Sequence, residues 1–332
     1  MLQNKTKIIW LMTNTCAGDS ISMLNSLHPD YRQMVEELFH FSFNEFFMAG
    51  EGGVATGVLE QALREPKGSY ILVVEGSIPT AAGGFYCVVG QRNGKPWTAL
   101  QAVTELAAGA NYVVAVGTCA SFGGPYAAHP NPTGSKPVNK VIPQKVINVP
   151  GCPVHPDWIA GTLFHLVRYG EPRLDDNNRP VLYYGETIHD RCQRRYYFEN
   201  SIFAEKPGEP WCTYKIGCKG PVTRADCPVR PWCGGHTNWP VGANTPCIGC
   251  TSPEFPDGMS PFFEHLPDIS LPGVKVAADR AGIITGAATA LGIGVHLAAN
   301  IATGRLAHVL RKGKKGQNTP SRIFKRLAQR RK

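Results

Sequence analysis

Four short apolar runs, each ending in turn residues, dominate the first half of the chain. They are KIIWLM (7–12), SYILVVEG (69–76), NYVVAVG (111–117) and KVINVPG (145–151). The runs are rich in β-branched residues and almost continuously apolar, which predicts strands buried on both faces. Between them, residues 31–41 and 97–110 show the i, i+3, i+4 spacing of amphipathic helices. Strands that alternate with helices predict an α/β fold with a doubly wound parallel sheet.

The character of the sequence changes after about residue 186. Pro, Gly, Trp and Cys dominate up to residue 268, and long periodic segments disappear. Such a segment has little apolar core of its own, so bound metal is a natural way to hold it together. Residues 281–304 then run without a formal charge and are rich in Ala and Gly. We therefore predict three parts: a sheet domain (1–185), a loop-rich domain (186–268), and a C-terminal helix with a basic tail (269–332).

The positive charge is concentrated in that tail. The formal net charge is +9, but residues 305–332 contain eleven of the 34 Lys and Arg and no acidic residue. The remaining 23 basic residues face 25 acidic ones, which leaves a net charge of −2 on the rest of the chain. The basicity therefore belongs to an extension and does not identify partners of the body.

The chain contains eleven cysteines, a high count for 332 residues. Its N-terminal sequence, MLQNKTKIIWLMTNTC, has no secretory apolar region and no twin-arginine pair, which predicts a cytoplasmic protein. In a reducing compartment, clustered cysteines more often bind metal than form disulfides. We expect metal centres, with disulfides or scattered core thiols as the alternatives.

Three isolated cysteines, Cys16, Cys119 and Cys152, directly follow predicted strands. The carboxyl ends of parallel strands meet at one edge of the sheet, where open α/β sheets place their sites. In the turn NTCAGDS (14–20), Asp19 is the nearest fourth ligand, and iron–sulfur clusters accept an occasional ligand other than cysteine. The alternative is that these are loop thiols and that Asp19 caps the following helix.

Two further sets of candidate ligands lie in the loop-rich segment. The first comprises His189, Cys192, Cys212 and Cys218. The second comprises Cys227, Cys247 and Cys250. One imidazole and three thiolates suit zinc or a 4Fe-4S cluster equally well. Three thiolates fit a 3Fe-4S cluster, or an incomplete 4Fe-4S site that Cys233 would complete.

Five motifs, in order along the chain, carry a specific resemblance. They are EGSIPT (75–80), AVGTCASFGG (115–124), NVPGCPVHPDW (148–158), HDRC (189–192) and NWPVGANTPCIGC (238–250). Together they resemble the small, electron-transferring subunit of nickel–iron hydrogenases, from about residue 7 to residue 268. The resemblance implies a flavodoxin-like first domain and a row of iron–sulfur clusters that passes electrons from a large subunit to an acceptor.

Carried over residue by residue, the resemblance implies two 4Fe-4S clusters and one 3Fe-4S cluster. The ligands would be Cys16, Asp19, Cys119 and Cys152 for a proximal 4Fe-4S cluster, His189, Cys192, Cys212 and Cys218 for a distal 4Fe-4S cluster, and Cys227, Cys247 and Cys250 for a medial 3Fe-4S cluster. Pro240 matches a family proline at the place of a fourth medial ligand, which argues against Cys233 as a ligand.

Asp19 departs from the usual pattern of the family, which has a cysteine at this position. Aspartate there resembles the actinobacterial-type, high-affinity subclass and implies oxygen tolerance. The oxygen-tolerant membrane-bound subclass instead adds two cysteines, at positions that are Gly18 and Gly124 in this chain. A carboxylate is a harder ligand than a thiolate, so we expect Asp19 to tune the potential of the proximal cluster.

The resemblance also implies the partners. Hydrogen would be split at a nickel–iron centre in a large subunit, since this chain lacks the paired C-x-x-C motifs of such a subunit. We expect an obligate heterodimer, with a dimer of heterodimers left open, an electron acceptor that the sequence does not identify, and no nucleic acid. Residues 281–304 are long enough to cross a bilayer, which takes about 20 apolar residues. Without an export signal, however, we expect a cytoplasmic complex in which this helix packs on a partner subunit or on a second copy of the heterodimer. The basic tail would then touch the inner face of the cell membrane.

Two alternatives remain at this point. The related small subunit of a quinone-reducing complex carries only the proximal-type site, so HDRC (189–192) and CIGC (247–250) argue against it. A zinc-stabilised binding module with a nucleic-acid-binding tail is compatible with the basic C-terminus. It leaves the cysteines at the strand ends unexplained.

Overall fold

The computed structural model describes residues 5–232, 235–264, 269–271, 274–276 and 278–305. The chain forms two compact units, Met1–His265 and Leu266–Lys332. The predicted boundary between residues 185 and 186 thus lies inside the first unit. Cys233 and most of the basic tail lie outside the described residues.

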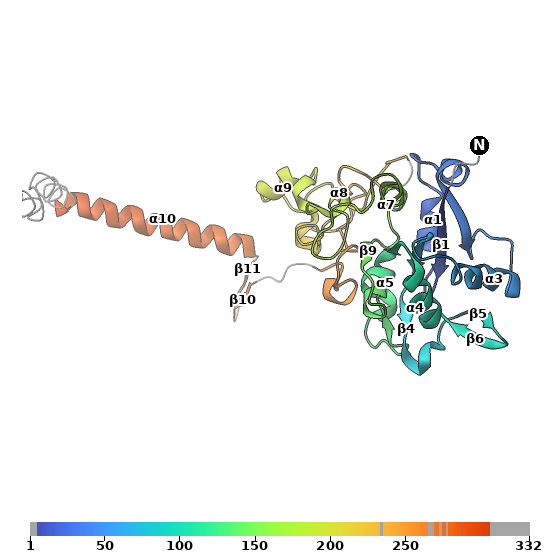
Figure 1. Ribbon diagram of the computed structural model, residues 1–332. Helices are drawn as coiled ribbons and strands as arrows, with labels where there is room; N and C mark the ends of the chain where they lie inside the picture. Colours follow the sequence, from blue (N-terminus) through green and yellow to red (C-terminus); the bar gives the residue numbers. More distant parts are fainter. Residues whose placement is uncertain (1–4, 233–234, 265–268, 272–273, 277, 306–332) are drawn as a thin grey trace, which may run out of the picture. The chain divides into compact units, whose positions relative to one another are not determined.

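A five-stranded parallel sheet forms the centre of the first unit, in the order β2-β1-β3-β7-β9 (Figure 1). Its strands are β1 (Thr6–Met12), β2 (Phe39–Asn44), β3 (Tyr70–Glu75), β7 (Tyr112–Val116) and β9 (Val146–Val149). The four apolar runs of the sequence are β1, β3, β7 and β9, which confirms the predicted sheet. The strand order is that of flavodoxin-like folds. In these folds the order in which successive strands are added to the sheet reverses between the first and third strands, and the functional site lies at that point.

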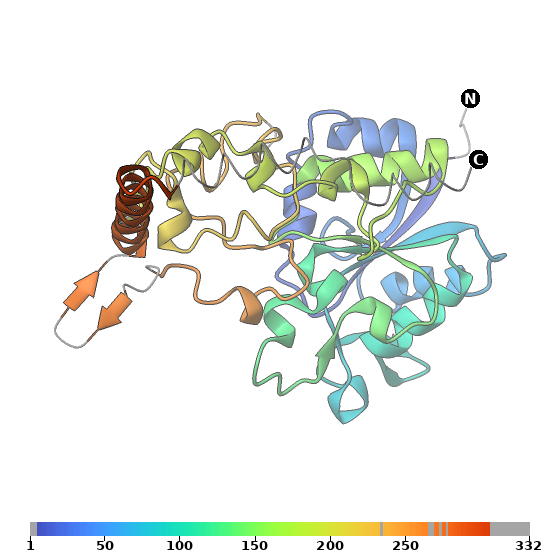
Figure 2. The ribbon, with the colours of Figure 1, turned by 90° about the vertical axis from the view of Figure 1, so that its left-hand side faces the viewer.

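Helices cover both faces of this sheet. One face carries α1 (Gly18–Met23) and α7 (Pro156–Tyr169), and the other carries α3 (Gly52–Ala62) and α4 (Ala99–Gly109). Figure 2 shows the sheet between these two layers. Successive side chains of a strand point to opposite faces, so Ile8 of β1 enters one core and Ile9 the other. Both side chains are fully buried.

The helix predicted over residues 31–41 is wrong beyond residue 38. A short helix, α2 (Tyr31–Gln33), continues as a π-helical turn, η1 (Met34–Leu38), and the chain then enters the edge strand β2. In FHFSFN (39–44) aromatic and polar residues alternate, which is the pattern of a strand. Phe39 is fully buried in the sheet core. The strand pattern therefore outweighs the helical spacing in these last residues.

The remaining elements of the first unit are short. Up to residue 140 they are β4 (Ile78–Pro79), η2 (Ala81–Gly84), β5 (Val88–Arg92), β6 (Lys95–Thr98), α5 (Gly117–Phe122), α6 (Gly124–Ala127), β8 (Ser135–Lys136) and η3 (Val138–Lys140). From residue 181 they are α8 (Val181–Tyr184), η4 (His189–Arg191), α9 (Arg195–Glu199), η5 (Thr213–Ile216) and η6 (Asp257–Met259). The described part of residues 186–264 therefore consists mainly of loops, as the sequence predicts.

The second unit contains a hairpin and one long helix. These are β10 (Ile269–Leu271), β11 (Val274–Val276) and α10 (Ala278–Ala302). From Ile283 to Ala302 the helix has 20 residues with a mean hydropathy of 1.4, and its large apolar side chains are exposed. The predicted C-terminal helix is thus present, and its length and composition suffice to cross a membrane.

Candidate metal centres

The structure brings Cys16, Cys119 and Cys152 together with Asp19 at the carboxyl edge of the sheet. Cys16 follows β1, Cys119 lies in α5 after β7, and Cys152 follows β9. Burial, followed by the negative charges of Cys152, Asp19 and Cys16, raises the pKa of the Cys119 thiol to about 12. Cys16 and Cys152 are exposed. The four side chains therefore form one electrostatically coupled site that opens to the surface of this chain.

Asp19 does not cap its helix. The residue preceding α1 is Ala17, in the left-handed conformation with a φ of 62°, and no side chain caps the helix. The Asp19 Oδ1 atom instead accepts a hydrogen bond of 2.7 Å from the backbone N–H of Val154. Burial, together with the charge of Glu75, raises the pKa of Asp19 to about 8. The helix-cap alternative is therefore wrong, and the carboxyl group lies against the loop that carries Cys152.

Glu75, at the end of β3, holds the turn that contains Cys16 and Asp19. Its carboxylate is fully buried and accepts hydrogen bonds from Trp10 Nε1 (3.0 Å) and the Thr15 hydroxyl (3.1 Å). It also accepts from the backbone N–H groups of Asp19 (3.3 Å) and Ser20 (3.2 Å) and from the Ser20 hydroxyl (2.5 Å). Sequence reasoning missed this role. The available signal was a carboxylate at the end of the otherwise apolar run YILVVE (70–75).

The second candidate set lines one small cavity of the loop-rich segment. The lining includes His189, Cys192, Cys212 and Cys218. Arg194 lines the same cavity, and its guanidinium donates to the backbone carbonyls of Glu209 (3.2 Å) and Trp211 (2.8 Å). The backbone N–H of Arg194 donates to the Cys192 sulfur at 3.4 Å. An arginine cation thus lies beside these sulfurs and partly offsets the burial that raises the pKa of the Cys192 and Cys212 thiols.

The third candidate set lines a cavity of about 390 Å³. Its thiols are Cys227, Cys247 and Cys250, together with Cys152 of the first set. Its other walls are largely apolar and aromatic, including Trp158, Ile188, Trp239 and Pro240. Burial raises the pKa of each of the three thiols. Buried thiols ionise only when a positive centre compensates their charge, and iron supplies such a centre. The cavity and its donors therefore fit an iron–sulfur cluster.

The spacing within the three sets disfavours single zinc ions. Four sulfurs at about 2.3 Å from a tetrahedral zinc lie about 3.8 Å from one another. Across the residues that the structure describes, the group of ligand atoms found within 4.8 Å of one another is His155, Asp157 and His236, which contains no cysteine. Within the described residues, none of the three sets therefore has three ligand atoms as close together as a single zinc ion requires.

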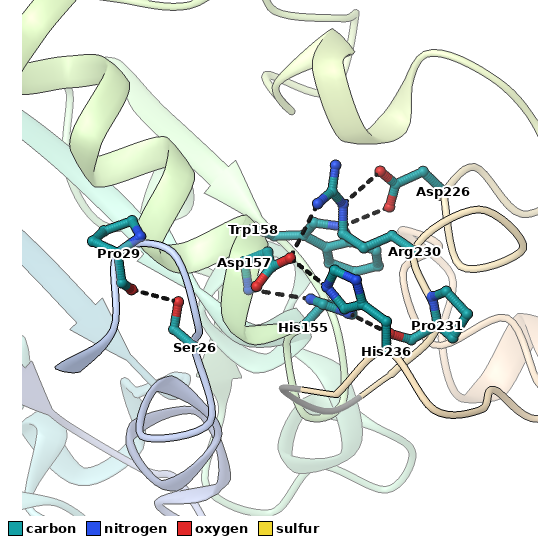
Figure 3. Close-up of polar contacts among 9 residues, drawn as sticks. All are labelled: Ser26, Pro29, His155, Asp157, Trp158, Asp226, Arg230, Pro231 and His236. Carbon is teal, nitrogen blue, oxygen red and sulfur yellow. Dashed lines mark hydrogen bonds and ion pairs between the residues drawn. The ribbon is translucent and has the colours of Figure 1, made fainter.

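His155, Asp157 and His236 form a polar network with little capacity for a metal ion (Figure 3). The Asp157 Oδ2 atom pairs with Arg230 (3.0 Å) and with His236 Nε2 (2.7 Å). His155 uses both ring nitrogens: Nδ1 accepts from the Asp157 backbone N–H (3.1 Å), and Nε2 donates to the Pro231 carbonyl (2.9 Å). The positive charge of Arg230 opposes a second cation at this place. The network instead ties the start of α7 to a loop beside the 390 Å³ cavity.

Comparison with known proteins identifies the family. The profile for the C-terminal part of the NiFe/NiFeSe hydrogenase small subunit matches residues 184–263, and that of "NADH ubiquinone oxidoreductase, 20 Kd subunit" matches residues 16–166. The periplasmic [NiFeSe] hydrogenase small subunit of Desulfomicrobium baculatum is 41% identical over 276 residues, covering 78% of this chain and 87% of the relative. The chain belongs to the nickel–iron hydrogenase small subunits.

Other relatives of this hydrogenase small subunit extend the match. The uptake hydrogenase small subunit of Azotobacter vinelandii is 36% identical over 316 residues, 93% of this chain and 85% of the relative. The structure of an actinobacterial-type NiFe-hydrogenase from Ralstonia eutropha H16 superposes with a TM-score of 0.75 at 29% identity, covering 96% of this chain and 93% of that one. The predicted family and subclass resemblance are thereby confirmed, and the zinc-module alternative is wrong.

Membership of the family establishes the general role. The hydrogenase small subunit pairs with a large subunit as a heterodimer and transfers electrons through iron–sulfur clusters. Hydrogenase activity belongs to this pair, with the nickel–iron centre in the large subunit. The donor sets described above fit such clusters in this chain.

The prediction of a cytoplasmic complex at the inner face of the cell membrane is wrong. The matching small subunits of Desulfomicrobium baculatum, Solidesulfovibrio fructosivorans and Nitratidesulfovibrio vulgaris are named periplasmic. The prediction relied on the residues before the first strand, in which no secretory apolar region and no twin-arginine pair were found. The expectation of metal centres does not depend on it, because thiolates bonded to iron are not free thiols and are compatible with an oxidising compartment.

Proposed function

We propose that this subunit relays electrons one at a time from the nickel–iron centre of a hydrogen-oxidising, uptake-type complex to an external acceptor. The order of the relay is proximal, medial and distal. Two electrostatic interactions between neighbouring sets support this order. The charge of Cys250 acts on the Cys152 thiol, which links the proximal and medial sets, and that of Cys218 acts on Cys247, which links the distal and medial sets.

We assign a 4Fe-4S cluster to each end of this relay and a 3Fe-4S cluster to its middle. The proximal ligands are Cys16, Asp19, Cys119 and Cys152, the medial ligands Cys227, Cys247 and Cys250, and the distal ligands His189, Cys192, Cys212 and Cys218. Such clusters supply one-electron carriers whose potentials depend on ligand type, hydrogen bonds to sulfur and solvent exposure. Pro240 in the wall of the medial cavity supports three protein ligands there.

Asp19 is the proposed ligand that distinguishes this proximal site. Its burial and its hydrogen bond from Val154 hold the carboxyl group beside the three thiols. A carboxylate donates less charge to iron than a thiolate, so it changes the potential of the proximal cluster. We propose that this change contributes to activity in air.

The large subunit is proposed to cover the proximal edge of this chain. Cys16 and Cys152 are exposed there, and the neighbouring apolar side chains of Ile21, Leu24 and Leu27 are between 43% and 47% exposed. Exposed apolar groups around a functional edge are typical of a protein interface. For α10, whose exposed apolar residues span 20 positions, we infer contact with a membrane, and a dimer of heterodimers is the alternative.

The first test is metal and acid-labile sulfide analysis of the complex, purified gently through a tag on this chain. Two 4Fe-4S clusters and one 3Fe-4S cluster predict about eleven irons per copy, with nickel and one more iron in the large subunit. Asp19→Ala should lower the iron content or shift the proximal potential, with Cys16→Ala as the reference for a lost ligand. Zinc without sulfide would overturn the relay, and an unchanged Asp19→Ala complex would remove Asp19 from the ligand set.

A further inference from the structure

A single hydroxyl group joins the proximal set to the medial set. Thr118, next to Cys119 in α5, is 1% exposed. Its Oγ1 atom accepts a hydrogen bond of 3.0 Å from the backbone N–H of Gly151 and donates to the backbone carbonyl of Cys250. The backbone N–H of Thr118 also donates to the Gly151 carbonyl at 2.9 Å. Thr118 therefore ties together three segments that each carry a candidate ligand.

These hydrogen bonds surround two ligand residues that line the same cavity. Cys152 and Cys250 both border the cavity of about 390 Å³. Gly151 directly precedes Cys152, and the carbonyl that Thr118 contacts belongs to Cys250 itself. The Thr118 hydroxyl thus holds the Cys152 segment through its acceptor lone pair and the Cys250 segment through its proton.

We propose that Thr118 is a positioning residue that fixes the separation and orientation of the proximal and medial clusters by joining the segments that carry Cys152 and Cys250. This inference rests on the proposed function, because that function assigns Cys152 and Cys250 to neighbouring clusters. A side chain with both a donor and an acceptor is required at this position. Serine meets that requirement, whereas valine has the shape of threonine and neither polar function.

The loop that carries Cys250 has a second attachment, so loss of the hydroxyl leaves it in place. Arg179, which is 3% exposed, donates from its guanidinium to the Thr251 carbonyl at 3.1 Å. Its charge is paired with Asp175 at 2.8 Å. Thr118→Val therefore removes the hydroxyl that sets the spacing, while the loop stays anchored one residue further along the chain.

Ser121 supplies a matched control on the same helix. Its side chain is fully buried, and its hydroxyl donates to the Ala115 carbonyl at 3.2 Å. Ser121 and Ala115 both belong to the sheet region. Ser121→Ala therefore removes a buried hydrogen bond without affecting the residues of the medial set. Any effect of general destabilisation should appear in both variants, and an effect on spacing should appear in Thr118→Val alone.

The experiment compares the wild-type heterodimeric complex with its Thr118→Val, Thr118→Ser and Ser121→Ala variants. Iron and sulfide content establish that the clusters are present. Electron paramagnetic resonance of the reduced complex then measures the magnetic interaction between neighbouring clusters, through signal splitting and relaxation. We expect Thr118→Val to keep its iron and to lose or reduce the proximal–medial interaction, while Thr118→Ser and Ser121→Ala leave it unchanged.

Two results would overturn the inference. An iron-loaded Thr118→Val complex with the wild-type interaction would show that the hydroxyl does not set the spacing. Loss of iron from both clusters in Thr118→Val, with Thr118→Ser intact, would mean that the hydroxyl serves folding instead. In either case the wild-type iron content still decides the proposed relay separately. A wild-type complex without these clusters would instead overturn the proposed function itself.

Discussion

The sheet region and the loop-rich region of the first unit hold their candidate ligands in different ways. In the sheet region, Cys16 and Cys152 follow strands whose places are set by backbone pairing and two apolar cores. In the loop-rich region, Cys227 and Cys247 lie between short turns and line a cavity. We therefore expect the sheet region to fold without metal, and the loop-rich region to depend on the cluster that fills its cavity.

Buried polar groups show the same difference. Glu75 in the sheet region finds protein donors for its carboxylate, so its burial is compensated within the chain. The thiols of Cys227 and Cys247 are buried with a raised pKa, and the charge of Cys250 adds to the rise at both. Iron bound by these sulfurs, as proposed above, would supply the compensation. In this comparison the sheet region is stabilised by its own contacts and only holds its cluster, whereas the loop-rich region would need its cluster for stability.

Removal of iron should separate the two regions most strongly. When the purified complex is stripped by oxidation and chelation, we expect amides of residues 186–232 and 235–264 to exchange hydrogen on the order of 100-fold faster or more, because metal binding supplies their folding energy. Amides of β1 and β3 should stay protected. Hydrogen–deuterium exchange with mass spectrometry measures both in one sample.

The control for this experiment is the same chelator saturated with iron beforehand. Equal loss of protection in β1 and in the loop-rich region would contradict the comparison, since it would make the whole unit depend on metal. Unchanged protection in both regions would contradict it as well, because the cavity would then be stable without its contents.

Replacement of Glu75 tests whether protein contacts alone stabilise the turn that carries Cys16 and Asp19. Glu75→Ala leaves buried donors of Trp10, Thr15 and Ser20 without their acceptor, and an unsatisfied buried donor costs about 1–3 kcal/mol. We expect the opening free energy of the Ser20 amide to fall by about 3 kcal/mol, which is about 100-fold faster exchange. Amide exchange in the iron-loaded complex measures it.

Glu75→Gln is the matched variant, since it keeps the shape and one acceptor oxygen. It should fall between the wild type and Glu75→Ala. If Glu75→Ala left the Ser20 amide as protected as in the wild type, the carboxylate would not hold the turn. Loss of protection in the loop-rich region before β1 would show that the two regions are coupled more closely than their ligand placement indicates.

The same contrast explains what could be predicted from sequence. The apolar runs at 7–12 and 111–117 predict their strands because continuous burial leaves a local signal, and the sheet then places Cys16 and Cys119 at one edge. Residues 39–41 fit both the helical spacing and the alternation of a strand. They form the edge strand β2 because pairing with β1 stabilises the extended conformation. Local periodicity does not reveal which of the two a neighbouring strand will stabilise.

The supporting contacts had no such signal. Thr118 donates to a backbone carbonyl and accepts from a backbone N–H, and backbone partners leave no trace in the residue types of a sequence. Asp19 looked like a helix cap because the residue type suits both roles, and only the Val154 contact separates them. In the loop-rich region, spacing grouped the two ligand sets but left zinc open, and only the family resemblance assigned iron–sulfur clusters to them. Their roles stay predictions.

The smallest expected effect is at His155, which links the start of α7 in the sheet region to Pro231 in the loop-rich region. There we expect amide exchange to depend on pH. This imidazole is 2% exposed, and burial lowers its pKa below the ordinary value of 6.5. Charge from Asp157 and Asp226 and the bond to Pro231 act in the opposite direction, and Arg230 adds to the lowering. The folded protein therefore keeps the ring neutral at pH values where an unfolded or open state takes up a proton.

The sign follows from proton linkage. Because the open state binds more protons, the stabilisation is fully present above pH 6.5 and is lost as the pH falls through the lowered folded-state pKa. A protonated Nδ1 no longer accepts from the Asp157 backbone N–H, so that amide should lose protection first. We expect its exchange, corrected for the intrinsic pH effect, to accelerate below pH 6.5, while His155→Gln removes this dependence. An Asp157 amide whose corrected exchange ignores pH in the wild type would show that the imidazole is not the link between α7 and the loop-rich wall.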